Sequence, residues 1–148
     1  MIRKRLPTSD DAMIHRMVIE QLVPYSRLYD AGQSVTFAEI RSRLNRNKTY
    51  VAARGFRKPY GFITFVRKSN VLFVDMLAID EREQGRGLGH ELMKTAEDYG
   101  RKERCKSVEL FVDDSNPRAI HFYTKRGYAV ETYIPELYCY KMSKRITR

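Results

Sequence analysis

Hydrophobic and polar positions recur with two periods along the 148-residue chain, and the changes of period predict its elements. Residues 71–79 are apolar except for Asp75, which is typical of a strand covered on both faces. A glycine-rich turn follows, and apolar residues then recur at helical spacing, at Leu88, Leu92, Met93, Ala96 and Tyr99. This strand, turn and helix form the segment around which we interpret the rest of the chain.

The first quarter of the chain predicts a strand, a helix and a loop. Residues 1–6 alternate apolar and basic side chains, as a half-exposed edge strand does. Thr8 and Asp11 form a T-x-x-D capping signature, and an apolar helical stripe follows until Pro24. Residues 23–35 have no clean period, so we expect a loop there with at most a short helical turn.

The remaining segments predict a second short helix and then mainly strands. Thr36 and Glu39 form another capping box, and that helix should run to about Asn47 with three apolar side chains pointing inward, Phe37, Ile40 and Leu44. Asn116 followed by Pro117 marks the start of a later helix that ends at Gly127. Strand-like runs occupy residues 50–54, 60–67, 107–112, 128–133 and 137–142.

These elements follow one another in the order β-α-α-β-β-β-α-β-α-β-β, which predicts an α/β fold with an α+β-like mixed sheet. We expect six or seven strands flanked by about four helices, and one parallel strand pair formed by the right-handed crossover between residues 71–79 and 107–112. A chain of 148 residues is the size of one ordinary domain, so residues 1–148 should form a single domain.

The glycine-rich turn predicts a site for a phosphate group. Glycines lack a Cβ atom, so the backbone at Gly85, Gly87 and Gly89 can approach an anion, and the N-terminus of the following helix adds free N–H groups. A dinucleotide fingerprint would need glycine at His90 or Leu92, and a P-loop would need G-K-S or G-K-T. Both of these phosphate-binding motifs are excluded.

The turn instead fits the pattern Q-x-R-G-x-G, read from Gln84 to Gly89, and here the sequence resembles the GNAT family of acyl-CoA N-acyltransferases. Residues 116–128, NPRAIHFYTKRGY, resemble the family's second CoA motif. The resemblance implies a fold whose fourth and fifth strands splay apart around acetyl-CoA, the cosubstrate. It assigns cofactor binding to Leu77, Ala78, Ile79, Gln84, Gly85, Arg86, Gly87, Leu88, Gly89, Asn116 and Tyr123.

The resemblance also implies an N-acetyltransferase that transfers acetyl directly to a primary amine. Tyr123 lies seven residues after Asn116, where the family has a tyrosine that reaches the CoA sulfur, so it is the expected general acid. The alternative for Tyr123 is a core aromatic. Asn116 could cap its helix, contact the pantetheine arm, or do both. Arg86 could bind a phosphate or be an ordinary exposed arginine.

A general base is harder to assign from the sequence. Asp75 interrupts a buried strand and, by strand alternation, shares a side with Phe73 and Leu77. A buried carboxylate needs a partner, a cleft or a raised pKa, so Asp75 could be the base or simply be paired with an arginine or a backbone N–H. Glu109 is a second candidate base. A water relay would remove the need for either side chain.

The resemblance implies that the acceptor is a small-molecule amine or an amine of a peptide or protein. Tyr25 and Tyr29 lie where the family often lines its acceptor pocket, although exposed tyrosines are common in loops. We expect no metal, because neither the cysteines nor the histidines have ligand spacing. No signal peptide or membrane span is evident, which predicts a cytoplasmic protein without a membrane partner, and either a monomer or a homodimer.

The formal net charge of +10 leaves an RNA-binding alternative open. Lys58 to Phe65 reads KPYGFITF, close to an RNA-recognition signature in which Tyr60 and Phe62 would stack on bases. No second aromatic strand motif stands upstream, so RNA is the less favoured partner, except as part of an RNA-bound or ribosomal substrate. Many of the basic residues should lie on solvated helix faces. A member that binds CoA without turnover is a third interpretation.

Overall fold

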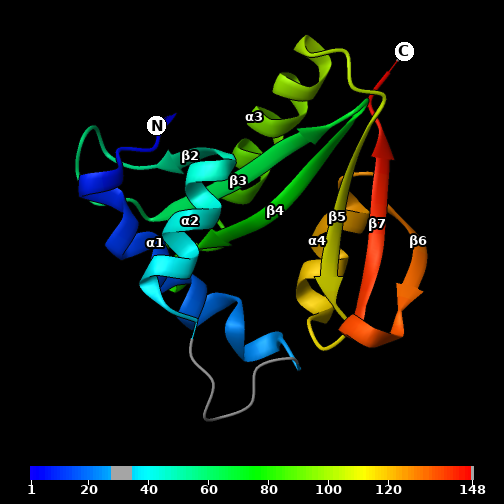
Figure 1. The fold of residues 1–148 in the computed structure, drawn as a ribbon, viewed down its shortest axis with the longest axis horizontal. Coiled ribbons are helices and arrows are strands. Elements are labelled where there is room, and N and C mark those ends of the chain that lie inside the picture. Colours follow the sequence, from blue (N-terminus) through cyan, green and yellow to red (C-terminus); the bar gives the residue numbers. More distant parts are fainter. Residues whose placement is uncertain (28–34, 148) are drawn as a thin grey trace.

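The computed structural model describes residues 1–27 and 35–147. Within them seven strands form one mixed sheet in the order β1-β2-β3-β4-β5-β7-β6 (Figure 1), which confirms the expected element order. The strands are β1 (Ile2–Lys4), β2 (Lys48–Ala52), β3 (Gly61–Lys68), β4 (Val71–Ile79), β5 (Ser107–Asp113), β6 (Ala129–Ile134) and β7 (Cys139–Arg145). The helices are α1 (Pro7–Gln21), α2 (Phe37–Arg46), α3 (Leu88–Lys102) and α4 (Pro117–Lys125), with short 3₁₀ turns η1 (Val23–Tyr25), η2 (Glu81–Glu83) and η3 (Pro135–Leu137).

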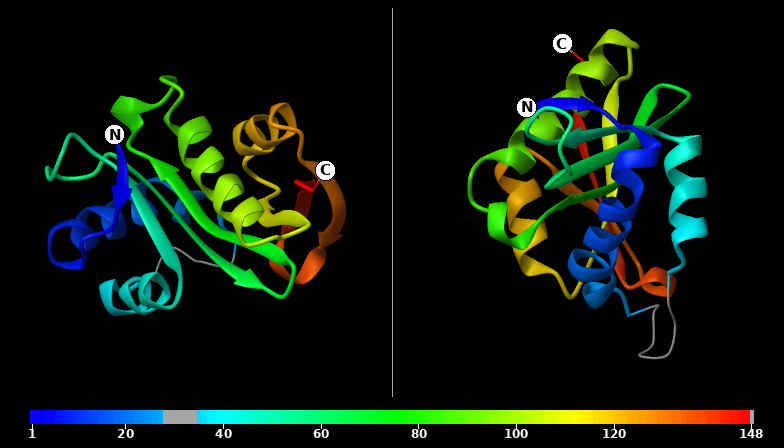
Figure 2. Two further views of the ribbon diagram at one scale, coloured as in Figure 1. Left: turned by 90° about the horizontal axis from the view of Figure 1, so that it is seen from above. Right: turned by 90° about the vertical axis from the view of Figure 1, so that its left-hand side faces the viewer.

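The helices lie in two layers on opposite faces of the sheet (Figure 2). Helices α1 and α2 bury Ile14 and Ile40 in one core, which we call the α1/α2-side core. Helix α3 buries Leu92 and Met93 in a second core on the other face, the α3-side core, to which α4 contributes Tyr123. Both cores follow from apolar stripes at helical spacing, because only one face of each helix packs on the sheet. No helix in residues 1–27 or 35–147 is long and apolar enough to span a bilayer.

The two capping predictions had different outcomes. At α2 the Thr36 side chain accepts from the Glu39 N–H at 3.1 Å, which confirms that capping box. At α1 the T-x-x-D prediction is wrong, because the helix begins at Pro7 and its N-cap has no side-chain hydrogen bond. Asp11, with its neighbour Asp10, is instead fully buried and neutralised by arginines of the N-terminal segment.

Those buried ion pairs fasten the edge strand to the first helix. Arg3 bonds both carboxylate oxygens of Asp10, at 2.7 and 3.0 Å, and Arg5 bonds both oxygens of Asp11 at 2.6 Å. A buried carboxylate is tolerated when a bidentate guanidinium replaces its water. Arg3 and Arg5 are therefore structural rather than solvated, whereas Lys4 between them is exposed. Phe37, expected to point inward, is 39% exposed.

A β-bulge at Asp75 changes the direction of the β4 side chains. Val74 and Met76 pair with consecutive residues of β3, so Asp75 has no partner of its own in that strand. Val74 therefore lies in the α3-side core, whereas Met76 lies in the α1/α2-side core. Leu77 packs on the α3-side core. The prediction that Asp75 shares a side with Leu77 is wrong, because an added residue reverses the alternation.

Strands β4 and β5 are parallel and separate after a short contact. Their pairing runs from Val71 opposite Ser107 to Val74 opposite Leu110 and stops there. Figure 1 shows the two strands diverging beyond this point, so that the sheet opens into a wedge. The expected splaying of these strands is confirmed. The C-terminal ends of β4 and β5 form the two sides of the open end of the wedge.

A buried carboxylate joins α3 to the elements on the far side of the wedge. Glu97 is 3% exposed and accepts from the Tyr128 hydroxyl at 2.7 Å, from Arg126 at 3.2 Å and from the Lys144 ammonium at 3.3 Å. We call these four side chains the Glu97 cluster. The sequence pattern predicts a strand from Tyr128 to Tyr133, but Tyr128 lies just before β6 and its hydroxyl belongs to the Glu97 cluster.

Candidate active site

A cavity of about 820 Å³ occupies the open end of the wedge. Its size is within the usual range for small-molecule sites. The end of α1, the β4 and β5 termini, the glycine-rich turn and the start of α4 line it. Most of the site residues expected from the sequence line it together: Tyr25, Asp75, Leu77, Ala78, Ile79, Gln84, Gly85, Gly87, Leu88, Gly89, Asn116 and Tyr123.

Three expected residues are not part of this lining. Arg86 and Glu109 belong to neighbouring surface that the cavity does not reach. Tyr29 lies outside the described residues. The side chain of Arg86 is 63% exposed and paired with Glu83 at 3.1 Å. Arg86 therefore has the environment of an exposed arginine in this structure.

The glycine-rich turn has the backbone of an anion site. Gly85 and Gly87 both have φ of +81°, a conformation that favours glycine, and α3 begins directly after Gly87. In the described part of the chain the N–H groups of Gly85, Arg86 and Gly87 donate to no backbone carbonyl. The first N–H groups of α3 are also free, because no preceding helical turn supplies carbonyl acceptors for them. An anion bound here would receive these N–H groups and the positive end of the helix dipole.

Gly89 serves packing rather than backbone conformation. A Cβ atom there would lie 3.1 Å from the Phe122 ring, which is closer than ordinary contact. Glycine therefore allows α3 and α4 to approach closely beside the turn. The sequence analysis grouped Gly89 with the other two glycines, but its requirement comes from a neighbouring helix.

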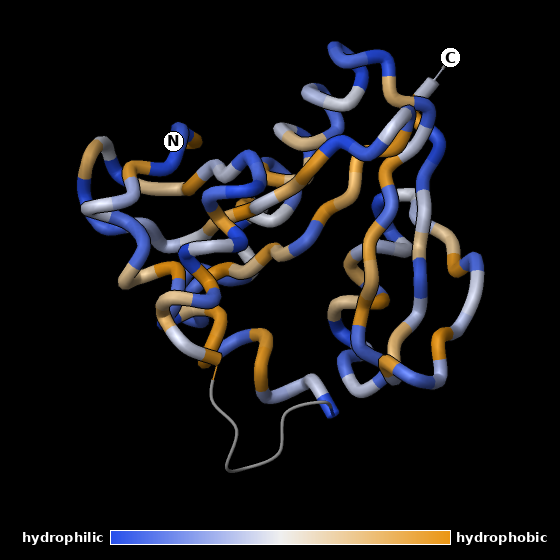
Figure 3. Tube along the Cα trace, in the orientation of Figure 1, coloured by the Kyte–Doolittle hydropathy of each residue, from blue (hydrophilic) through white to orange (hydrophobic). Residues whose placement is uncertain are grey.

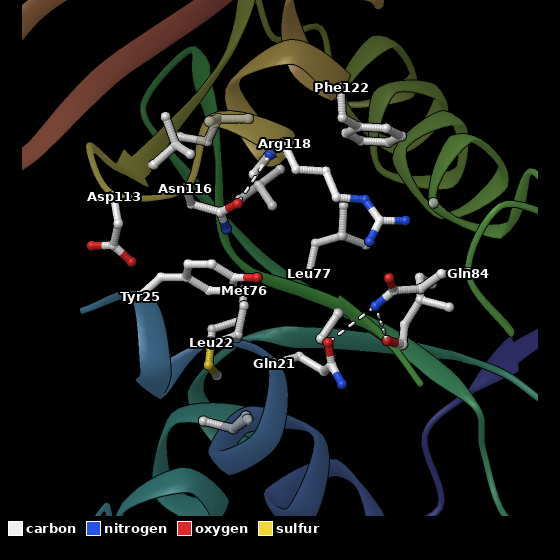
Figure 4. A pocket seen from close by; sticks show the side chains of 18 of the residues that line it. Gln21, Leu22, Tyr25, Met76, Leu77, Gln84, Asp113, Asn116, Arg118 and Phe122 are labelled. Atoms are coloured by element: carbon white, nitrogen blue, oxygen red, sulfur yellow. Dashed lines mark hydrogen bonds between the residues drawn. The ribbon is translucent and has the colours of Figure 1, made fainter. Parts of the chain in front are cut away.

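Gln84 fastens the turn to the preceding strand and to α1. Its side-chain amide donates to the Ile79 carbonyl and to the Gln21 side chain, both at 3.0 Å (Figure 4). These bonds hold the turn at the end of β4. The Gln84 side chain therefore fixes the position of the turn, and the groups available to bind an anion are the backbone N–H groups.

The wedge-facing edge of β4 offers backbone hydrogen-bonding groups. The Asp80 N–H donates to the Tyr60 carbonyl at 2.8 Å, so residues 78 and 80 face β3. In an antiparallel ladder the alternate residues face the other way, so Leu77 and Ile79 direct their backbone groups into the wedge. The Ile79 carbonyl is occupied by Gln84, which leaves the Leu77 groups and the Ile79 N–H for a ligand.

Tyr123 lies at the inner wall of the cavity. Its side chain belongs to the α3-side core, with the Phe122 ring at 5.2 Å and the Tyr128 ring at 5.9 Å between centroids. Burial raises the pKa of the Tyr123 hydroxyl above its usual value, so the group stays protonated at neutral pH. Tyr123 therefore packs in the core and also lines the cavity, so the two alternatives considered from the sequence are compatible.

Asn116 caps α4. Its side-chain oxygen accepts from the Ala119 N–H at 3.1 Å, which satisfies one of the free donors at the helix start. Asn116 also lines the cavity, and Figure 4 shows its side chain facing the open space. Its amide nitrogen is therefore available to a ligand while the oxygen caps the helix.

Both carboxylates considered as bases are held by cations. Arg43 bonds Asp75 at 2.6 and 3.1 Å, and the Asn47 side chain donates to the same carboxylate at 3.1 Å. Glu109 pairs with Lys141 at 3.2 Å. The structural pairing left open for Asp75 is the environment that this structure describes.

Asp113 and Arg118 line the cavity and were missed by the sequence analysis. Asp113 is the last residue of β5, and burial followed by repulsion from Asp114 raises its pKa to about 6. Arg118 lies in the first turn of α4, and Figure 4 shows its side chain directed into the cavity near Leu77 and Phe122. One feature of the sequence could have identified them: both residues lie within three positions of Asn116, where β5 ends and α4 begins.

The loop after α1 forms the wall of the cavity next to Asp113. The Ser115 hydroxyl donates to the Tyr25 carbonyl, and Arg27 pairs with Asp114 at 3.2 Å. These contacts join the loop to the segment between β5 and α4. Tyr25 lines the cavity, and its contact with an acceptor stays a prediction.

The RNA-binding alternative depended on exposed aromatic side chains in β3. Phe62 is fully buried in the α1/α2-side core, and Tyr60 packs on the α3-side core. A base cannot stack on a buried ring. From Gly61 to Phe65 this segment is a buried strand, while Lys58 is exposed and Tyr60 is half-buried just before β3.

Comparison with protein families agrees with this geometry. The family model described as acetyltransferase (GNAT) family matches residues 14–128, which is well over half of the chain. Among curated proteins, the uncharacterized N-acetyltransferase MJ1207 of Methanocaldococcus jannaschii is 33% identical over 78 residues, and YxbD of Bacillus subtilis is 28% identical over 71 residues. Each match spans 48% of this chain, but only 34% of MJ1207 and 43% of YxbD.

Solved structures share the whole fold. Ard1 from Thermoplasma volcanium has a TM-score of 0.80 at 23% identity, over 100% of this chain and 98% of that one. The PaiA N-acetyltransferase from Thermoplasma acidophilum, solved with coenzyme A, has a TM-score of 0.81 at 18% identity, over 98% of both chains. At such identities the likeness concerns the fold, while the family model covers the sequence. The chain belongs to the acetyltransferase (GNAT) family.

Proposed function

We propose that the protein is an N-acetyltransferase that transfers the acetyl group of acetyl-CoA to a primary amine. The observation that carries this proposal is the wedge between β4 and β5, which opens beyond Val74 and Leu110 directly beside the glycine-rich turn. One ligand with a pyrophosphate and a long polar arm would fill both features. Acetyl-CoA has that shape, and a PaiA structure of the same fold contains coenzyme A.

The pyrophosphate would bind at the turn, where the N–H groups of Gly85, Arg86 and Gly87 donate to no backbone carbonyl of the described residues and α3 begins. Arg118 would add a positive charge from the opposite wall. The amide groups of the pantetheine arm would pair with the free edge of β4 at Leu77 and Ile79, as an added strand does. This arrangement leads the thioester toward Tyr123 and Asn116.

Tyr123 would act as the general acid. In direct transfer the amine nitrogen forms a bond to the thioester carbon, the carbon–sulfur bond breaks, and the sulfur takes a proton while the nitrogen loses one. A buried hydroxyl with a raised pKa keeps its proton until a thiolate develops nearby. The two cysteines, Cys105 and Cys139, are buried and do not line the cavity. Neither thiol is therefore placed to form an acyl-enzyme, and the proposed transfer is direct.

The test is a calorimetric titration with acetyl-CoA, followed by an acceptor screen that measures free CoA thiol. We expect micromolar binding and acetyl-dependent release of thiol with at least one primary amine. Gly87→Glu is the matched control, because it places a carboxylate at the anion site and a side chain at φ of +81°. It should abolish binding while leaving the far-UV circular dichroism unchanged.

Two results would contradict the proposal. Absence of acetyl-CoA binding to the wild-type protein would refute the cofactor assignment. Binding without thiol release for small amines, peptide N-termini and lysine side chains would favour a member of the family that binds CoA without turnover.

A further inference from the structure

We infer that Asp113 receives the ammonium group of the acceptor amine and takes its proton before transfer. This inference rests on the proposed N-acetyltransferase activity and extends it to an acceptor class, alkylamines that carry no carboxylate near the amine. It is supported by the position of Asp113, by the lack of a partner for its carboxylate and by the side chains around it.

Asp113 occupies the end of the wedge nearest the start of α4. It lies on β5 three residues before Asn116, and both residues line the cavity. The alternation of β5 places Asp113 on the same face as Phe111, which also lines the cavity and whose ring contacts Phe73 at 5.3 Å. An amine bound here would approach the thioester from the α1/α2 face, while the cofactor enters beside the glycine-rich turn.

The carboxylate of Asp113 is free to accept a proton. It has no ion pair or hydrogen bond with any residue in the described part of the chain, in contrast to Asp75 and Glu109. Its pKa is raised to about 6 by partial burial and by the adjacent charge of Asp114. A base of this strength is mostly ionised at neutral pH and holds a proton better than an ordinary aspartate does.

Nearby groups make this end of the cavity suitable for a cation. On the loop after α1, Tyr25 lines the same cavity as Asp113, and Arg27 pairs with Asp114. From β6 the Tyr133 hydroxyl donates to the same Asp114 at 2.8 Å, and from β7 the buried Cys139 lies opposite Asp113 in register. An aromatic face and an unpaired carboxylate are a common setting for an alkylammonium ion.

The remaining cations of the cavity lining are placed elsewhere. Arg43 is bound to Asp75, and Arg118 projects from α4 toward Leu77, on the side of the proposed pyrophosphate site. A carboxylate on the acceptor would thus meet the unpaired charge of Asp113, because Arg27 is already paired with Asp114. Like charges about 4 Å apart repel strongly enough to cost about tenfold or more in affinity. Alkylamines without a carboxylate are therefore the favoured acceptors.

The proton transfers balance in the following way. The carboxylate of Asp113 takes one proton from the alkylammonium ion, and the neutral amine then attacks the thioester carbon. The carbon–sulfur bond breaks, and the hydroxyl of Tyr123 gives its proton to the departing sulfur. The new amide nitrogen loses its second proton, which restores Tyr123 through water, and Asp113 releases its proton to solvent.

The experiment is the pH profile of kcat/KM between pH 5 and 9, with butylamine as the probe and 4-aminobutanoate as its carboxylate-bearing counterpart. We expect the wild-type profile to rise through an inflection near pH 6, and butylamine to exceed 4-aminobutanoate by about tenfold. Asp113→Asn should lower kcat/KM for butylamine at pH 7.5 by about 100-fold and remove the inflection. Its acetyl-CoA affinity, measured by calorimetry, should stay within about threefold of wild type.

Asp114→Asn is the matched control. It makes the same chemical change one residue away, at a carboxylate that does not line the cavity. Because Asp114 raises the pKa of Asp113, this variant should keep the inflection and move it to lower pH. Wild-type kcat/KM and an unchanged inflection in Asp113→Asn would overturn the inference, as would loss of the inflection in Asp75→Asn alone. Failure of the wild-type protein to acetylate any primary amine would refute the proposed function itself.

Discussion

At the scale of single residues, Tyr123 allows a direct test of acid catalysis. Its ring packs in the α3-side core, but its hydroxyl bonds no residue in the described part of the chain. Tyr123→Phe should therefore lower kcat by about 100-fold, because the departing thiolate loses its proton donor. Acetyl-CoA affinity and thermal stability should change little, since packing is retained. Steady-state kinetics and calorimetry measure the two effects separately.

Tyr128→Phe is the control for that prediction. The Tyr128 ring lies 5.9 Å from Tyr123, but its hydroxyl donates to Glu97 at 2.7 Å. Removing it should cost about 1 to 3 kcal/mol of folding free energy, because a hydrogen bond to a buried carboxylate is lost. Its kcat should remain near wild type. An equal loss of kcat in the two variants would point to a packing effect and contradict the acid assignment.

Asp113 should destabilise the folded protein when it is ionised. Its pKa is about 6 when folded and near 4 when unfolded, so the folded state binds the proton more tightly and stability falls as pH rises from about 4 to 6. Asp113→Asn removes this penalty. Discounted for solvent exposure, we expect the variant to be more stable than wild type by about 1 kcal/mol at pH 8.

Urea denaturation at pH 4.5 and pH 8 measures this effect. The advantage of Asp113→Asn should shrink at pH 4.5, where the aspartate is protonated in the folded state. An isosteric change that stabilises the fold while lowering activity is the expected signature of a carboxylate retained for function. A variant that is less stable than wild type at pH 8 would indicate a structural partner for Asp113.

Several residues of the site could be predicted because short-range chemistry determines them. The glycine-rich turn and the Asn116 cap depend on neighbours within a few positions, so their spacing is visible in the sequence. The environments of Asp75 and Asp113 depend on partners that are remote in sequence. Arg43 reaches Asp75 across 32 positions, and the pKa of Asp113 is raised mainly by burial in the folded protein, with Asp114 adding to it.

At the scale of elements, the order of strands and helices followed from periodicity, whereas the bulge in β4 did not. An extra residue leaves the apolar pattern of residues 71–79 intact and reverses only the direction in which the side chains point. The bulge directly follows Val74, the last residue of β4 that pairs with β5. The same local irregularity thus turns Asp75 toward Arg43 and directs the Leu77 backbone into the wedge.

The Glu97 cluster predicts how α3 is held against the C-terminal elements. Glu97→Ala would leave Arg126 and Lys144 without their buried partner and the Tyr128 hydroxyl without its acceptor. We expect a loss of about 3 to 5 kcal/mol in the free energy of unfolding, measured by urea denaturation. Asp98→Ala, on the same helix but in an exposed pair with Arg101, should cost less than about 1 kcal/mol.

Similar losses in the two variants would contradict a special contribution of the buried cluster. Glu97→Gln should lie between them, since it keeps the shape and one acceptor oxygen but removes the charge.

At the scale of the whole molecule, the basic residues divide into two groups. Arg3, Arg5 and Arg43 neutralise carboxylates inside the fold, so part of the basic charge is structural. The residues from Arg101 to Lys106 are mostly exposed where α3 ends and the chain returns to β5, a hydrophilic end of the molecule in Figure 3. The net charge of +10 does not by itself identify a nucleic-acid partner, because it combines these two uses.

The wedge predicts that acetyl-CoA stabilises the molecule as a unit. Beyond Val74 the two halves of the sheet share no β4–β5 hydrogen bonds, and the ligand would join the β4 edge to α4 across that opening. A ligand at 100 times its Kd contributes about 2.7 kcal/mol. For a chain of this size the melting temperature should therefore rise by about 5 to 10 °C, measured by scanning calorimetry.

The fragment 3′-phospho-ADP separates the two halves of this prediction. It carries the pyrophosphate but lacks the pantetheine arm, so it can occupy the glycine-rich turn without reaching Leu77 or Tyr123. At the same multiple of its own Kd it should raise the melting temperature equally, because mass action depends only on occupancy. Hydrogen exchange should differ, with acetyl-CoA slowing exchange at the β4 edge and the fragment protecting only the turn. Equal protection of the β4 edge by both ligands would contradict the proposed path of the arm through the wedge.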